Sequence, residues 1–156
     1  MFDIVLYEPE IPPNTGNLLR LAANTGCRLH VVKPLGFSLS DRALKRSGLD
    51  YGDIANLTVH EDWNACARHF DSRHFYAFTT RAERCYADVR YQPGDVFLFG
   101  PETRGLPAHV LNVLPVDRRL RLPMVAGSRS VNLANAASIA VYEAWRQVGF
   151  AGAAQP

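Results

Sequence analysis

Two Gly/Pro-rich turns carry most of the residues that could bind a ligand. The first turn follows the apolar run Val96–Phe99 and places Glu102 and Arg104 on a loop directly after Gly100 and Pro101. Gly100 allows a close approach to the backbone because it has no side chain, and Pro101 fixes the direction of the chain. We therefore expect a loop shaped for a ligand, with a carboxylate and a guanidinium beside it.

The second turn follows Arg121–Val125, which we expect to be a short strand that Pro123 restricts to an edge or an end. From Ser130 onward, apolar residues recur every three or four positions and predict one long helix that stops at Gly149. Ser130 or Asn132 can cap the start of this helix and leave backbone N–H groups beside the turn.

A polar stripe marks the first predicted helix, which we expect to begin near Asn14 with that side chain as its cap. Asn14, Asn17, Arg20 and Asn24 recur at steps of three, three and four, which places them on one side of a helix. A solvated face usually carries Lys and Glu. Three asparagines around one arginine favour a hydrogen-bonding surface for a ligand or partner.

The order of the remaining elements predicts the fold class. Strands alternate with helices, which is typical of an α/β fold with a mostly parallel sheet in a single domain, residues 1–156. Residues 81–95 are interpreted as a long connection. The other expected strands are 3–8, 29–34, 56–60 and 74–80, and the other expected helices are 62–70 and a short basic one, 41–46, whose Arg42, Lys45 and Arg46 could meet phosphates.

Composition narrows the classes of protein. At 156 residues and 47% hydrophobic content the chain can bury one core, but a net charge of +2 is weak for binding a long duplex. Three widely spaced cysteines and histidines without HExxH spacing give no sign of a metal site. With no basic leader and no apolar run long enough for a bilayer, we expect a soluble cytoplasmic protein without a membrane partner.

The two turns and the first helix together resemble a known set of motifs. Glu8–Gly26, Phe97–Pro107 and Arg121–Gln147 are similar to motifs one, two and three of the SPOUT RNA 2′-O-methyltransferases, in the family's order. The resemblance extends over roughly residues 4–148 and implies a C-terminal trefoil knot. Within the family, the likeness is greatest to small stand-alone bacterial enzymes that methylate the wobble ribose, cytidine or modified uridine, in the anticodon loop of leucine tRNAs.

The resemblance also implies roles for individual residues. S-adenosylmethionine would be the cofactor, and its sulfonium methyl would pass in line to a ribose 2′-hydroxyl. Arg20 would hold the adjacent phosphate and hydrogen-bond the developing alkoxide, because a guanidinium stays protonated. The implied catalytic residues are Arg20, Asn17, Glu102 and Asn132; the cofactor-binding residues are Phe78, Gly100, Glu102, Leu122, Met124, Ser130 and Asn135; the RNA-binding residues are Arg20, Arg129 and Tyr142.

A homodimer with a shared active site follows from the same resemblance. Arg20 would come from the opposite subunit, and a two-fold packing of the first and last helices would bury Leu133, Val141 and Trp145. Alternatively, these apolar residues cover the sheet of their own chain.

Two other functions stay open at this point. One is a methyltransferase of the same family that acts at another tRNA or rRNA position. The other is a noncatalytic module that binds RNA or adenosine.

Overall fold

One parallel sheet organises the chain, as the alternation of elements predicts. The computed structural model describes residues 1–39, 57–71 and 73–154, and within them seven strands pair in the order β3-β2-β1-β6-β4-β7-β5. Every pairing is parallel. The strands are β1 (Asp3–Tyr7), β2 (Arg28–Val32), β3 (Leu57–His60), β4 (Phe75–Phe78), β5 (Arg84–Cys85), β6 (Val96–Phe99) and β7 (Arg119–Arg121).

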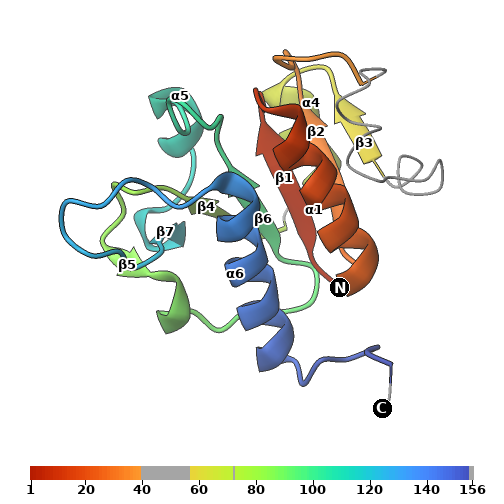
Figure 1. Cartoon of the computed structure of the whole chain (residues 1–156), viewed down its shortest axis with the longest axis vertical. Coiled ribbons are helices and arrows are strands. Elements are labelled where there is room, and N and C mark those ends of the chain that lie inside the picture. Colours follow the sequence, from red (N-terminus) through yellow and green to blue (C-terminus); the bar gives the residue numbers. More distant parts are fainter. Residues whose placement is uncertain (40–56, 72, 155–156) are drawn as a thin grey trace.

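Helices cover both faces of this sheet. The described helices are α1 (Pro12–Thr25), α4 (Trp63–Phe70), α5 (Ala108–Leu111) and α6 (Leu133–Gln147), with 3-10 turns η1 (Tyr86–Asp88) and η2 (Val116–Arg118). α1 and α6 lie side by side on one face, and α4 packs on the other (Figure 1). None of the described helices is long and apolar enough to cross a bilayer.

β1 shows why the central strands are continuous apolar runs. All five of its residues are buried, because successive side chains point to opposite faces and both faces are covered. Ile4 and Leu6 pack in the core beneath α1 and α6. Val5 and Tyr7 pack in the second core, with α4 and the segment that contains α5.

The start of α1 differs from the prediction. The helix begins at Pro12, with Ile11 in the N-cap position and no side-chain capping bond. Two prolines at the first helical positions explain this start, because their fixed φ suits a helix and their missing N–H groups need no partner there. The predicted capping role of Asn14 is wrong. Its side chain lies inside the first turn and is only 5% exposed.

The boundaries of α6 confirm the prediction. The Asn132 side chain accepts hydrogen bonds from the backbone N–H groups of Ala134 at 2.9 Å and Asn135 at 3.3 Å. The helix ends at Gln147, and Gly149 follows with φ +68°, the left-handed conformation that glycine adopts at little cost. The predicted cap and stop signals are therefore both used.

Two segments differ from their predicted structure. The strand expected over Arg121–Val125 is wrong: β7 ends at Arg121, and Pro123, which cannot donate to a ladder, lies in the loop that follows. Residues 81–95 contain β5 and η1, which the sequence interpretation missed. The predicted basic helix over 41–46, with Arg42, Lys45 and Arg46, and the first residue of the strand expected at 56–60 lie outside the described residues.

The apolar residues proposed for a dimer surface belong to the core of the single chain. Leu133, Val141 and Trp145 are at most 9% exposed and pack against the sheet and α1. The alternative interpretation is therefore correct for these three side chains. On α6 the exposed apolar side chains are Ile139 and Tyr142.

Candidate functional site

A cavity of about 380 Å³ opens at the carboxyl ends of β4 and β6. This edge is where ligands bind in open α/β sheets, and the volume lies in the usual range for small-molecule sites. The cavity draws on three distant parts of the sequence: the start of α1, the loops after β4 and β6, and residues 122–133. The predicted residues that line it are Phe78, Gly100, Glu102, Leu122, Met124, Ser130 and Asn132.

Gly100 begins the loop that forms one wall of the cavity. A Cβ atom at this position would lie 2.3 Å from the backbone nitrogen of Leu106 and 2.5 Å from the carbonyl carbon of Gly105. The loop folds back on itself, and the Gly105 N–H donates to the Pro101 carbonyl oxygen at 2.9 Å. Glycine is therefore required at position 100 because the backbone of the same loop packs against it. The close approach of a ligand that the sequence predicts at Gly100 stays a prediction.

Glu102 ties this loop to the start of α1. Its carboxylate accepts hydrogen bonds from the backbone N–H groups of Glu10 at 2.8 Å and Ile11 at 3.2 Å. It also accepts one from the Asn14 side-chain amide at 3.0 Å. The Asn14 carbonyl oxygen in turn accepts from the Asn132 side-chain amide at 3.0 Å.

The direction of this chain of hydrogen bonds is fixed at both ends. Glu102 as a carboxylate can only accept, and the Asn132 oxygen is held by the N–H groups of α6, so its amide must donate. Asn14 fits between them in a single orientation. The chain joins all three sequence motifs. Sequence reasoning missed this role of Asn14, although its place in the polar stripe of α1 was a signal.

Charged side chains next to Glu102 form ion pairs. The Arg104 guanidinium lies 2.9 Å from the Glu8 carboxylate and 3.5 Å from that of Glu10. The Thr103 hydroxyl donates to Glu10 at 2.6 Å, and this bond lowers the pKa of Glu10. Arg104, which the sequence placed beside the ligand, is thus engaged by two carboxylates.

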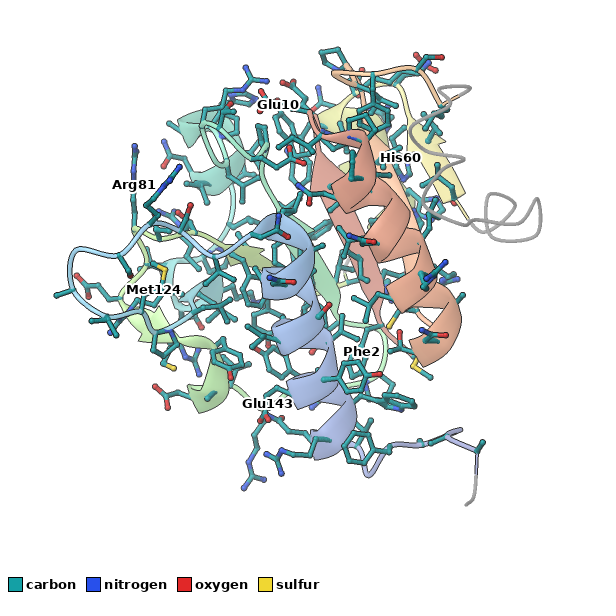
Figure 2. All side chains as sticks on the ribbon, viewed as in Figure 1. Phe2, Glu10, His60, Arg81, Met124 and Glu143 are labelled. Atoms are coloured by element: carbon teal, nitrogen blue, oxygen red, sulfur yellow. The ribbon has the colours of Figure 1, made fainter. Side chains whose placement is uncertain are left out.

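Apolar side chains form the floor of the cavity. The rings of Phe78 and Phe99 stack with centroids 4.7 Å apart and an interplanar angle of 17°. Leu106, Leu122 and Met124 complete an apolar lining that suits a planar ring. Figure 2 shows Met124 on the long loop that leads from β7 into α6. Leu106 was not predicted, because nothing in its local sequence separates it from an ordinary core leucine.

Five of the predicted site residues do not line the cavity. Asn17 and Arg20 lie on the exposed side of α1, and Asn135, Arg129 and Tyr142 are exposed on α6 and the loop before it. Arg20 is six residues from Asn14, so it lies about 9 Å further along the axis and about 120° away around the helix. Within one chain, Arg20 and the cavity are not brought together.

A second buried polar cluster lies at the amino end of β1, away from the cavity. Burial would raise the pKa of Asp3, but hydrogen bonds from His30, Arg28 and Arg73 hold it well below its usual range. The neighbouring ring of His60 lies 3.1 Å from His30, and burial, with the positive charge that His30 and His69 can carry, lowers the pKa of His60 to about 4. Across the described ranges, no group of three or more His, Cys, Asp or Glu could hold a metal ion.

The sequence matches a family of RNA-modifying enzymes. Residues 1–142 match the model of the SpoU rRNA Methylase family, and the chain belongs to this family. Membership of this family implies the trefoil knot expected for the C-terminal part, and the knot itself stays a prediction.

Known relatives are similar over nearly the whole chain. A tRNA (cytidine(34)-2′-O)-methyltransferase of Methylovorus glucosotrophus is 58% identical over 153 residues, which cover 98% of this chain and 99% of the relative. A solved structure described as giving insights into 2-OH methylation of C/U34 on tRNA is 44% identical, with a TM-score of 0.89 over 96% of this chain and 97% of the other. An AdoMet-bound rRNA methyltransferase of Sinorhizobium meliloti shares the fold, with a TM-score of 0.80 at 20% identity over 94% of this chain and 56% of the other.

Proposed function

We propose that this protein methylates the 2′-hydroxyl of the wobble ribose, on cytidine or modified uridine, in leucine tRNAs. The observation that carries the proposal is the 58% identity to a tRNA (cytidine(34)-2′-O)-methyltransferase over 98% of this chain. The cavity and its three-motif hydrogen-bond chain lie inside that matched length. The assignment to leucine tRNAs is the more specific part of the proposal. It comes from the resemblance of the three motifs to those of the enzymes that methylate the wobble ribose.

The residues around the cavity fit S-adenosylmethionine as the cofactor. The apolar floor of Phe78, Leu122 and Met124 suits an adenine ring, and the loop that begins at Gly100 would offer backbone polar groups to its edge. When bound, this cofactor supplies a methyl group on a sulfonium, which is a good leaving group. Glu102 adds a negative charge to the wall of the cavity, although three hydrogen bonds already hold its carboxylate in place.

The protein's task in such a reaction is to position the ribose and assist its hydroxyl. Arg20 would hold the neighbouring phosphate and donate a hydrogen bond to the oxygen as negative charge develops on it. Its guanidinium is always charged, so it stabilises the alkoxide as a donor. The chain from Glu102 through Asn14 to Asn132 holds the loops and α6 in one arrangement, which keeps the reacting groups aligned.

Arg20 can reach a cavity if a second copy of the chain supplies it. Asn17 and Arg20 are exposed on α1, and the exposed apolar residues Ile139 and Tyr142 lie on the neighbouring helix α6. A symmetric dimer through these two helices would cover that apolar surface and place each Arg20 toward the partner's cavity. We therefore propose a homodimer with two shared active sites.

The direct test of the reaction maps the methyl group. Purified protein and S-adenosylmethionine are incubated with tRNA from cells that lack wobble ribose methylation, and nuclease fragments are analysed by mass spectrometry. A new 2′-O-methyl group on the wobble nucleotide of leucine tRNAs is the expected result. Arg20→Ala should lower the rate of methyl transfer at least about 100-fold, while its free energy of unfolding stays within about 0.5 kcal/mol of wild type. A methyl group at another nucleotide would contradict the assigned substrate.

The shared site has a separate test in mixed dimers. One partner carries Arg20→Ala, and the other carries Leu122→Trp, which places a larger side chain in the cavity from the loop after β7. Each variant alone should be inactive. After unfolding and refolding together, random pairing gives half heterodimers with one intact site each, so about a quarter of the wild-type activity returns. No return of activity in a preparation that is shown to contain heterodimers would contradict the shared site.

A further inference from the structure

Positive charge is concentrated in two segments that adjoin the cavity. We call residues 79–84 and 116–129 the basic rim; they comprise the loop after β4, η2, β7 and most of the loop toward α6. The rim holds six arginines and two acids, a net charge of +4, in a chain whose total is +2, so all other residues together carry −2. The weak overall charge therefore conceals a strongly basic surface. Its arginines are Arg81, Arg84, Arg118, Arg119, Arg121 and Arg129.

Strand pairing and hydrogen bonds join the two segments of the rim. β5 pairs with β7 so that Cys85 lies beside Arg121, and neighbouring strands are about 5 Å apart. The Arg84 guanidinium donates to the Asp117 carbonyl oxygen at 2.7 Å, and that of Arg121 donates to the Glu83 carbonyl oxygen at 3.2 Å. These bonds go to neutral carbonyl groups, so they orient the guanidinium groups and leave their charges uncompensated.

Arg81 occupies the point where the rim meets the cavity. It lines the cavity, it is exposed, and within the described part of the chain its guanidinium has no hydrogen-bond or ion-pair partner. The other arginine of the lining, Arg104, is engaged by Glu8 and Glu10. Figure 2 shows Arg81 on the loop after β4, with its side chain reaching outward from the ribbon. The preceding Thr80 also lines the cavity and is exposed, so its hydroxyl is a second donor there.

We propose that the basic rim binds the RNA backbone and that Arg81 holds a phosphate near the target ribose. This inference rests on the proposed function, because it assumes that RNA is the substrate. A guanidinium presents a planar fork of donors that matches phosphate, and clustered arginines supply the sequence-independent part of RNA affinity. On the other side of the cavity, Glu8, Glu10 and Glu102 outnumber Arg104, which disfavours a polyanion there. The RNA strand therefore enters over β5 and β7.

The experiment measures binding of the anticodon stem-loop of a leucine tRNA by fluorescence anisotropy from about 0.05 to 0.3 M KCl. Arg81→Ala should raise Kd about tenfold near physiological salt and reduce the slope of log Kd against log salt by about one. Arg81→Lys keeps the charge and should recover most of the affinity. Arg90→Ala is the matched control, because Arg90 is also exposed and, among the described residues, has no partner. Its Kd should stay within about twofold of wild type.

Binding of S-adenosylhomocysteine, measured by calorimetry, distinguishes an RNA phosphate from the cofactor's own carboxylate. Its Kd should be unchanged in Arg81→Ala. If Arg81→Ala weakens binding of S-adenosylhomocysteine but not of RNA, the proposal is overturned. Equal losses of RNA affinity in Arg81→Ala and Arg90→Ala, or no RNA binding by the wild type, would also overturn it. If wild-type protein binds RNA with the expected Arg81 dependence but transfers no methyl group, the basic rim stands and the proposed function fails.

Discussion

The hydrogen-bond chain through Asn14 can be tested by a substitution that changes one side-chain nitrogen to oxygen. Asn14→Asp keeps the shape of the side chain but replaces the amide that donates to Glu102 at 3.0 Å by a carboxyl oxygen. Two carboxyl groups then face each other at a position that is only 5% exposed in the wild type. The introduced carboxyl can keep the hydrogen bond only while it is protonated, so its pKa is raised.

The size of the effect follows from this geometry. Two full charges about 3 Å apart repel by about 5 kcal/mol at an effective dielectric constant of 20. Protonation of the new carboxyl limits the loss to about 1.4 kcal/mol for each pH unit above its unfolded pKa of about 3.9. Glu102 is half-buried, so solvent reduces the repulsion. We expect a loss of about 2–4 kcal/mol at pH 7.

The sign of the pH dependence is set by the raised folded-state pKa. Below about pH 4 the free energy of unfolding of the variant is close to that of wild type. It falls as pH rises through the pKa of the new carboxyl in the folded state. Urea denaturation at several pH values measures this, and Asn17→Asp, on the exposed side of α1, is the control. Parallel pH profiles for the two variants would show that Asn14 does not donate to Glu102 and would refute the reasoning.

Two further predictions concern Gly100 and His60. Gly100→Ala should cost about 3 kcal/mol and abolish S-adenosylmethionine binding in calorimetry, because the new methyl group meets backbone atoms at 2.3 and 2.5 Å. Gly149→Ala, at φ +68° but with open space around it, should cost only about 1 kcal/mol. Burial lowers the pKa of His60 to about 4, so stability present above about pH 6.5 is lost as pH falls toward 4. Between pH 7 and 4.5, the free energy of unfolding of His60→Gln, measured by urea denaturation, should fall by about 2 kcal/mol less than that of wild type. A pH profile parallel to that of wild type would contradict this.

Sequence reasoning identified most of the elements that hold the site. Asn132 as a cap, Gly149 as a stop and the buried runs of β1, β4 and β6 follow from local rules of helix ends and strand burial. β5 and η1 were missed because two-residue and three-residue elements carry no periodic signal. The strand expected over Arg121–Val125 ends at Arg121 because Pro123 cannot donate to a ladder, and Leu122 and Met124 line the cavity from the loop that follows.

The sequence by itself determined the motifs, the family resemblance and seven residues of the cavity lining, because glycines, prolines and capping residues act on the backbone nearest to them. Only the tertiary structure decided which polar groups meet. In the sequence, Asn14 is 88 residues from Glu102 and 118 residues from Asn132. Parallel strands bring the segments that carry them to one edge of the sheet. The same packing assigned Leu133, Val141 and Trp145 to the core and left Arg81 exposed at the cavity mouth. Such contacts depend on the distance between elements in space, which periodicity along the chain does not encode.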